Sequence, residues 1–531
     1  MANISIYLIF LPVITSLFIY MIKKRYILFL ILLNQMALTY LTYIFFRFID
    51  EQGSYYMYMG GWSNVIGIAF KVDRLALSFL IFTNIIWWVT ILYSWNKIAV
   101  DYKYTFFLLF LQGVFLGLVQ TNDLFSVFVF IELITIISTI LIIYKKDGYS
   151  VRAGFYYLLF NSVGMLFYLI GLCIIYNVAG SLNMESVKGL VQPYKETLTL
   201  KFAYVFIMSG LGVKSAFFPV FNWLPKAHGA APASISALLS GLLVKSGLYM
   251  FIRINEIFAF EQFRIVFLYI GFATALAGVI FALSQKDMKQ ILAFHTISQV
   301  GIILIGISAD FGDLYYGGLL HLFNHGFFKA LLFLGAGFII NELNMRRVTE
   351  IRGIFKTYPS IALLMMVGMF SITGLPFFSG YVSKSIIKYN LTDTTGVSVL
   401  LNMINLGTII SFIKVSQIFY GEKNDGKNEV IYVNISMGIL AIFCIAIGIA
   451  PKFIMESVWD ISLNLPDLYA FKKWVEYAMY LGLGWIIYKQ FIEKDHQVIK
   501  AIRHISISFG TAIVLLISFV FGLVTYTLYI Y

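Results

Sequence analysis

The chain has 531 residues, of which 60% are hydrophobic and only 12% are charged. This charged share is about half that of a soluble domain, which excludes a water-soluble globule of this length. The net charge of +12 belongs to no basic soluble domain, so it indicates cytoplasmic loops of a membrane protein rather than nucleic-acid binding.

Sixteen apolar runs of membrane-spanning length follow one another along the chain. They are expected near Asn3–Ile22, Tyr26–Phe46, Leu75–Trp95, Tyr104–Val119, Asp123–Tyr144, Ala153–Tyr176, Phe202–Leu224, Ala233–Ile254, Ile265–Leu283, Gln290–Ile307, Leu314–Ile340, Ile361–Ile387, Val397–Tyr420, Ile431–Ala450, Trp474–Phe491 and Ile505–Tyr526. The longest breaks, Ile49–Phe70 and Pro451–Lys473, are too short for a soluble domain. The sequence therefore predicts an all-α integral membrane protein with about fourteen core helices and two C-terminal helices.

The orientation in the membrane follows from the basic residues. The first span has no basic residue before it, whereas Lys23, Lys24 and Arg25 follow it. A cleaved signal peptide carries its positive end first, so we interpret this span as a retained helix with its N-terminus outside. Basic residues are also more frequent in the odd-numbered loops, which then face the cytoplasm.

Lysines within the spans recur at a nearly constant distance. Lys214 and Lys384 lie 170 positions apart, and Lys245 and Lys414 lie 169 apart. Spans four to eight and nine to thirteen therefore read as two copies of a five-helix unit, and an odd number of helices gives the copies opposite orientations. The predicted organisation is 1–103 for helices 1–3, 104–260 for the first repeat, 261–422 for the second, and 423–531 for helices 14–16.

Both copies contain residues that break a helix. Span seven has Pro219 and Pro225, and span twelve has Gly374 and Pro376. Proline removes a backbone donor, and at membrane depth such a break requires cover for the freed carbonyls. We expect helices 7 and 12 to be discontinuous, as in transporters, although a simple packing kink is the structural alternative.

Nine ionisable residues lie within the spans: Glu132, Lys214, Lys245, His295, His321, His325, Lys329, Lys384 and Lys414. A charged side chain costs roughly 2.5–3.5 kcal/mol at the bilayer centre. One carboxylate cannot neutralise five lysines, so ion pairs alone do not explain the set. Burial disfavours charged lysine, and histidine titrates near neutral pH, so lysine and histidine linked by water suit proton transfer. Sodium prefers oxygen ligands, and the spans are poor in Asp and Glu.

Three of these residues form a column. His321, His325 and Lys329 are spaced four apart, so they project from one face of a helix. We expect them to face a hydrated polar axis between the two broken helices, with Lys329 one turn closer to the cytoplasm. The alternative is that they hydrogen-bond neighbouring helices and only fix packing.

Other polar residues are more ambiguous. His295 could be a packing residue, and Lys226 and His228 are expected at a helix end near the cytoplasm, where charge is tolerated. Asp73 and Arg74 are interfacial, and an anchoring role remains open. Cys173 and Cys444 provide no disulfide framework and no iron–sulfur ligand set, so no cofactor and no metal site are expected.

Several stretches resemble the antiporter-like subunits of Mrp cation/proton antiporters, respiratory complex I and membrane-bound hydrogenases. They are "FVFIELITIIS", "GVKSAFFPVFNWLPKAHGAAPASISALLSGLLVKSGLY", "QILAFHTISQVG", "HLFNHGFFKALLFLGAG" and "GLPFFSGYVSKSIIK". The resemblance implies a key pair of Glu132 and Lys214. It also implies functional roles for Lys245, for His321 and His325 as the central link between two half-channels, and for Lys384. It further implies fourteen core helices with two inverted five-helix units, partner membrane subunits, and location in a prokaryotic cell membrane.

The C-terminal region narrows the resemblance. Some complex I members carry a long lateral helix after the core, whereas here about eighty residues follow Ala450, with two weak apolar runs. This is more similar to the D-type subunit of Mrp antiporters or its hydrogenase counterpart. Lys226 stands where many relatives have an acid, which leaves the subfamily open.

The resulting hypothesis is a proton-translocating subunit of a multi-subunit complex, coupled to cation antiport or to a redox partner module. The chain has no redox or hydrolytic motif of its own, so whether it belongs to an enzyme such as an NADH-quinone oxidoreductase or hydrogenase complex stays open. A stand-alone Na⁺/H⁺ antiporter and a non-transporting scaffold are the alternatives. A haem-bearing electron carrier would need histidine pairs on two helices, and His321 and His325 lie on one.

Overall fold

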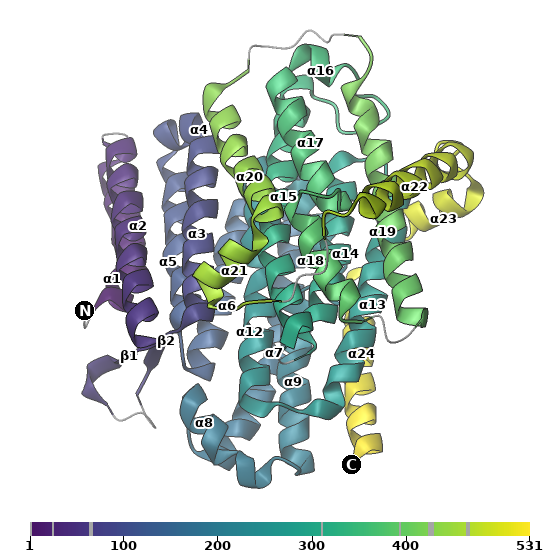
Figure 1. Cartoon of the computed structure of the whole chain (residues 1–531). Coiled ribbons are helices and arrows are strands. Elements are labelled where there is room, and N and C mark those ends of the chain that lie inside the picture. Colours follow the sequence, from purple (N-terminus) through teal and green to yellow (C-terminus); the bar gives the residue numbers. More distant parts are fainter. Residues whose placement is uncertain are drawn as a thin grey trace. The chain divides into compact units, whose positions relative to one another are not determined.

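The protein is described from a computed structural model that covers residues 3–23, 26–62, 67–309, 312–391, 395–422, 429–463 and 468–531. Lys24 and Arg25, used above for orientation, lie outside these described residues. Within the described part, thirteen helices are long and apolar enough to cross a membrane. The protein is a multi-pass membrane protein built almost entirely of helices, as the sequence predicted (Figure 1).

The helices divide into two compact units. The first comprises residues 1–215, 242–260 and 509–531. Its helices are α1 (Ile4–Ile22), α2 (Ile27–Gln52), α3 (Arg74–Tyr93), α4 (Trp95–Val100), α5 (Tyr102–Gln120), α6 (Leu124–Ile142), α7 (Gly148–Ala179), α8 (Met184–Leu190), α9 (Leu198–Lys214), α12 (Lys245–Phe258) and α24 (Phe509–Ile530). In this unit α7 and α24 both pack against α9.

The second unit comprises residues 216–241 and 261–508. Its helices are α10 (Trp223–Ala230), α11 (Ala233–Leu238), α13 (Glu261–Ser284), α14 (Met288–Ile307), α15 (Gly312–Leu343), α16 (Ile354–Thr357), α17 (Pro359–Thr373), α18 (Ser379–Tyr389), α19 (Thr395–Ser416), α20 (Ile431–Ile449), α21 (Pro451–Trp459), α22 (Phe471–Ile487) and α23 (Gln497–His504). Here α15 contacts α11, α14, α17, α18 and α20, so it occupies the middle of the unit.

Short turns of tighter or wider helix join these elements. The 3₁₀ turns are η1 (Met59–Gly61), η2 (Ile143–Lys145), η3 (Gln192–Tyr194) and η5 (Gln417–Phe419), and the π-helical segments are η4 (Leu239–Leu243) and η6 (Tyr488–Ile492). The segment η4 connects α11 with α12, so the eighth expected span is one continuous run, Ala233–Phe258. π-helical turns are rare and occur frequently at functional sites.

Three of the sixteen expected spans are absent from the thirteen uninterrupted ones. Two are the spans with helix breakers: the seventh is divided into α9 and α10, and the twelfth into α17 and α18. Pro219 and Pro376 lie in the non-helical breaks, and Gly374 ends α17 with a φ of +80°, a conformation that favours glycine. Pro225 was expected to break the helix, but it lies in the first turn of α10, where a missing N–H is tolerated.

The third absent span is the fifteenth. The expected run Trp474–Phe491 became α22 and η6, and α22 has only 17 residues. It packs on α19 and lies across that helix rather than alongside it (Figure 1). The last expected span is confirmed as α24.

The loop at Ile49–Phe70 contains a hairpin that the sequence analysis did not predict. Strand β1 (Tyr55–Tyr58) pairs antiparallel with β2 (Ala69–Val72), with Tyr55 opposite Val72. Side chains of β1 alternate between buried and exposed, as expected of a strand with one covered face. The run of aromatic residues favours this conformation.

The scarce acidic residues have a clear structural use at helix starts. Five aspartates accept a hydrogen bond from the backbone N–H three residues later, at 2.6–3.1 Å, which satisfies a free donor of the first turn. They are Asp73, Asp101, Asp123, Asp147 and Asp287. Five of the 26 acidic residues therefore serve at helix ends.

Small residues allow α14 and α15 to approach closely. A Cβ atom at Gly306 would lie 2.3 Å from the Cα atom of Gly318, so only glycine fits at this crossing. Close backbone packing through small residues is typical of membrane helices. The contact brings the polar residues of α15 next to those of α14.

Candidate functional site

Lys214 is the last residue of α9, directly before the break, and only 1% of it is exposed. Its Nζ donates hydrogen bonds to Thr135 Oγ1 at 2.8 Å and to Tyr157 OH at 3.2 Å. Thr135 belongs to α6 and Tyr157 to α7, so one ammonium group joins three helices. Both contacts are uncharged hydroxyl groups.

Glu132 lies on α6 one turn before Thr135. Its Oε2 accepts a hydrogen bond from Ser162 at 2.8 Å, and its buried Oε1 has no hydrogen-bond partner among the described residues. No ion pair joins Glu132 to Lys214 in the described part of the chain. The expected approach of Glu132 to Lys214 stays a prediction. Thr135, which accepts a hydrogen bond from Lys214, lies one turn after Glu132 on α6.

Lys245 is the first residue of α12 and is fully buried. It comes just after η4, so Lys245 lies where the π-helical segment ends and the α-helix begins. The first turn of α12 packs closely against Ser215, because a Cβ atom at Gly247 would lie 2.3 Å from Ser215 Oγ. The start of α12 is thereby held against the end of α9, where Lys214 lies.

His321 connects three helices of the second unit and is fully buried on α15. Its Nδ1 is 2.8 Å from Ser383 Oγ on α18, and its Nε2 is 3.1 Å from Gln299 Oε1 on α14. Asn324, one turn away, donates to the Ser379 carbonyl and to Ser383 Oγ. These contacts attach α15 to the second half of the broken helix.

Lys384 follows Ser383 on α18, and its side chain links α18 to α17 across the second break. Its Nζ donates to the Ile372 carbonyl at 2.6 Å and to Asn405 Oδ1 at 3.1 Å. The Ile372 carbonyl belongs to the last turn of α17, where intrahelical donors are missing. A cation at a helix C-terminus is also favoured by the helix dipole.

The rest of the α15 column is buried as well. His325 and Lys329 are both 0% exposed. Lys329 Nζ donates to the Leu292 carbonyl of α14, and its ammonium lies 5.5 Å from the centre of the Phe333 ring. The His325 ring packs against Phe328 at 5.5 Å. The three residues of the column therefore all face the protein interior, although His321 and Lys329 bind different parts of α14.

Lys414 of α19 binds three backbone carbonyls. Its Nζ donates to the carbonyls of Ala282, Leu283 and Gln285 at 2.7–3.1 Å. The first two belong to the last turn of α13 and the third lies just after it, so Lys414 caps the C-terminus of this helix. Such a cap is a structural role in its own right.

The two remaining histidines of the candidate set are buried as well. His228 was expected at a helix end, and it lies in the last turn of α10, where it is 0% exposed and its ring stacks on Phe333 at 4.4 Å. His295 is also fully buried, and neither of its ring nitrogens has a hydrogen-bond partner in the described part of the chain. A buried polar group of this kind calls for a water molecule or another hydrogen-bond partner. Lys226 donates to the Ile507 carbonyl at 2.8 Å.

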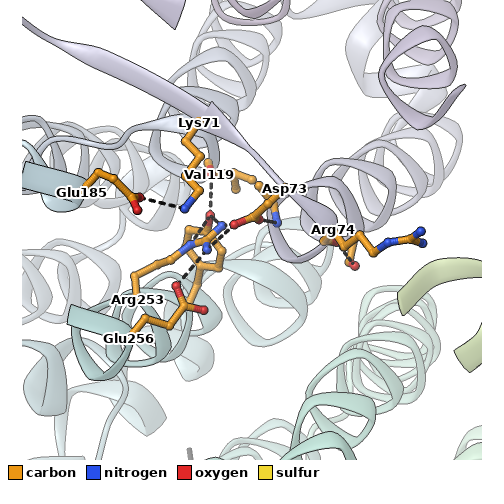
Figure 2. Close-up of polar contacts among 10 residues, drawn as sticks. Lys71, Asp73, Arg74, Val119, Glu185, Arg253 and Glu256 are labelled. Atoms are coloured by element: carbon orange, nitrogen blue, oxygen red, sulfur yellow. Dashed lines mark hydrogen bonds and ion pairs between the residues drawn. The ribbon is translucent and has the colours of Figure 1, made fainter. Parts of the chain in front are cut away.

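An ion-pair cluster in the first unit surrounds Asp73 (Figure 2). The Arg253 guanidinium binds both Asp73 oxygens, at 2.6 and 2.7 Å, and donates to Glu256 at 3.1 Å. It also donates to Tyr249 OH, which in turn donates to the Val119 carbonyl at 2.6 Å. Sequence reasoning considered Asp73 and missed Arg253, which lies 180 residues away.

The electrostatics of this cluster are those of a stable pair. Burial opposes ionisation of Asp73, but the Arg253 charge and hydrogen bonds, with the Ala76 N–H, outweigh it and hold the pKa of the Asp73 carboxyl well below its usual range. Nearby, Lys71 Nζ binds Glu185 at 3.0 Å. The bidentate geometry and the helix cap favour an anchoring role for Asp73.

The described residues contain no group of three or more His, Cys, Asp or Glu arranged to hold a metal ion. The titratable groups of the candidate site are the lysines and histidines described above, together with the part-buried Glu132. Such groups can accept and release protons.

Comparison with known proteins shows which family the chain belongs to. Over 482 residues the chain is 28% identical to a D-type subunit of the Na(+)/H(+) antiporter of Alkalihalophilus pseudofirmus, and the match covers 88% of this chain and 97% of that protein. The fold is similar to a chain of the Mrp complex from Dietzia sp. DQ12-45-1b, with a TM-score of 0.81, 22% identity and coverage of 91% of this chain and 99% of that one. It is equally similar, with a TM-score of 0.81, to a chain of the membrane-bound sulfane sulfur reductase, an archaeal respiratory membrane complex, at 25% identity and coverage of 90% and 99%.

The family described as "NADH:quinone oxidoreductase/Mrp antiporter, TM" matches residues 121–413, more than half of the chain. This stretch contains every residue predicted above for the proton pathway except Lys414, which lies just beyond it. The chain belongs to the NADH:quinone oxidoreductase/Mrp antiporter transmembrane family.

Proposed function

We propose that the protein is a proton-translocating, antiporter-like subunit of a multi-subunit membrane complex of the Mrp type or of a related respiratory complex. The family membership and the names of its relatives support this assignment. The partners are then other membrane subunits. Protons are the species that this chain moves, and sodium would enter only through the complex as a whole.

The observation that carries the proposal is a pair of buried hydrogen-bonded groups in the second unit, which meet at the adjacent residues Ser383 and Lys384. Gln299 contacts His321, His321 contacts Ser383, and the next residue, Lys384, contacts Asn405. Two of these groups, the imidazole and the amine, can bind and release a proton. Hydrogen bonds and short water links between such groups are what proton transfer requires.

The first unit offers a second group of the same kind. Lys214 is held by hydroxyl groups of α6 and α7, and Glu132 lies one turn away on α6. Lys245 is buried at the start of α12. We assign proton transfer to these three residues together with His321, His325, Lys329, Lys384 and Lys414.

The finer architecture that we propose is two inverted five-helix repeats in a fourteen-helix core, with the ranges 104–260 and 261–422. Helix starts support it: α6 begins at 124 and α14 at 288, and α7 begins at 148 and α15 at 312, an offset of 164 in both cases. The helices α7 and α15 have 32 residues each. Lys214 precedes its break whereas Lys384 follows its own, so the repeat is proposed for helices and not for individual lysines.

We also propose the orientation with the N-terminus outside, in the cytoplasmic membrane of a prokaryotic cell. The basic residues that follow the first span support it. With this orientation the hairpin β1–β2 and the Asp73–Arg253 cluster face the outside.

A non-transporting scaffold is the second candidate, and one observation favours it. Lys329, Lys384 and Lys414 each donate to backbone carbonyls, so each could serve only as a structural cap. A stand-alone antiporter is less well supported, because the spans are poor in the carboxylates that would bind sodium. Expression of the chain alone in antiporter-deficient cells tests that alternative.

The direct test is proton flux through the purified complex in liposomes that contain a pH-sensitive dye. The variant Lys384→Gln keeps one hydrogen-bond donor but cannot exchange a proton at neutral pH. The proposal expects flux to be lost while the complex remains assembled. Unchanged flux would support the scaffold.

A further inference from the structure

A cavity of about 200 Å³ reaches Lys384 within the second unit. Residues of α18, α19 and α22 line it, among them Lys384, Lys388, Asn402, Asn405, Glu476 and Tyr477. Its volume exceeds many times the space that one water molecule needs. The lysine assigned above to proton transfer is thus adjacent to a space that water can fill.

One carboxylate stands at this cavity. Glu476 of α22 is the only acidic residue among the described residues that line it. Its Oε1 lies 3.3 Å from Lys388 Nζ, and its Oε2 lies 3.6 Å from Lys473 Nζ. The Lys388–Glu476 pair connects α22 to α18, one turn beyond Lys384, whereas the pair with Lys473 stays within α22.

The helix that carries Glu476 is attached to the break as well. Tyr477 OH lies 2.9 Å from Thr373 Oγ1, at the last residue of α17. Just before α22, Tyr469 stacks on Phe377 within the break at 4.8 Å. A movement of α22 would therefore change contacts with both halves of the discontinuous helix, α17 and α18.

Resting on the proposed function, we propose that the Lys388–Glu476 ion pair is a gate that controls the access of water and protons to Lys384. The side chains of both residues are about one third exposed (33% and 36%). Ion pairs of this exposure are weak, so thermal motion suffices to open them. The short α22, which lies across α19 (Figure 1), is the element that moves.

The test is the accessibility of the cavity to a thiol reagent. Ser385 lines the cavity next to Lys384, so Ser385→Cys reports on it, in a background in which the exposed Cys173 is replaced by serine. The assembled complex is treated with a charged, membrane-impermeant methanethiosulfonate. Glu476→Gln should raise the labelling rate about two- to fivefold, the range expected from breaking one exposed ion pair.

Two further variants make the outcome decisive. Lys388→Gln breaks the same pair from the other side, so it should give a similar increase, and the double variant should label no faster than either single variant. Glu456→Gln, on the exposed face of α21 outside the cavity, is the matched control and should change nothing. Unchanged labelling in Glu476→Gln, or additive increases in the double variant, would overturn the gate.

Failure of the gate and failure of the proposed function give different results. If labelling responds as expected but Lys384→Gln retains full proton flux, the gate stands and proton transfer by Lys384 is refuted. If Lys384→Gln abolishes flux but labelling ignores Glu476, the transport function stands and the gate is refuted.

Discussion

Replacing Lys384 by arginine separates the two roles that its position allows. Arginine retains a cation and donors for the Ile372 carbonyl and Asn405, but its guanidinium is not deprotonated in proteins. A residue that only caps α17 should tolerate this change, whereas a residue that releases a proton should not. We expect Lys384→Arg to assemble normally and to lose proton flux.

The hydrogen bonds of Lys384 set the scale of the stability effects. Each bond contributes about 0.5–1.5 kcal/mol net, so losing both in Lys384→Met should cost about 1–3 kcal/mol. Lys384→Arg can remake both bonds and should stay within about 1 kcal/mol of the parent protein. A large drop in flux without a matching drop in stability is thus the signature of proton transfer.

The assay combines proton flux in dye-loaded liposomes with thermal unfolding followed by tryptophan fluorescence. Lys289→Arg is the matched control, because Lys289 is a buried lysine of the same unit, is not assigned to proton transfer, and donates to the Ala231 carbonyl at 2.7 Å. It should retain flux. Full flux in Lys384→Arg would show that Lys384 does not release a proton during transport and serves only as a cap.

The remaining predictions concern other sites. Asp73→Ala should destabilise the protein by about 1.5–3 kcal/mol because it removes the bidentate partner of Arg253 and leaves only Glu256 as its counter-ion, and Asp73→Asn should cost less because it keeps the helix cap, as measured by thermal unfolding. Because the pKa of Asp73 is lowered by folding, the pair should stabilise the protein fully above the unfolded pKa of about 4 and progressively less below it, so the difference between parent and Asp73→Asn should shrink as the pH falls below about 4; a constant difference would contradict this. Glu132→Gln should keep the hydrogen bond from Ser162 and the assembly of the complex but reduce proton flux; parental flux would exclude Glu132 from the pathway.

The apolar helices could be located from the sequence because a bilayer span needs about twenty apolar residues in a row. Thirteen of the sixteen expected spans correspond to uninterrupted helices, and two of the other three are those in which helix breakers had been recognised. The fifteenth was overestimated, since its apolar run covers a helix of 17 residues that ends in a π-helical turn. Apolar composition alone does not distinguish a helix that spans from one that lies across a neighbour.

The candidate site was predicted in its residue types rather than in its contacts. The four-residue spacing placed His321, His325 and Lys329 on one face of a helix because helical geometry is local, and all three are buried on α15, whereas the hydrated axis that they were expected to face stays a prediction. The partners of His321 on α14 and α18 depend on tertiary packing, and so does the pairing of Asp73 with Arg253 across 180 residues. The break at Pro219 was visible, whereas the capping role of Lys414 was not, because carbonyl acceptors leave no trace in a sequence.

The central claim is that protons pass through the buried histidine and lysine groups of this chain. Proton flux through the reconstituted complex that carries both His321→Gln and His325→Gln tests it most directly, since glutamine keeps polarity and hydrogen bonding but cannot carry a proton at neutral pH. We expect an assembled complex with flux reduced to the background of empty liposomes. Flux equal to that of the parent complex would contradict it and leave packing as the role of the column.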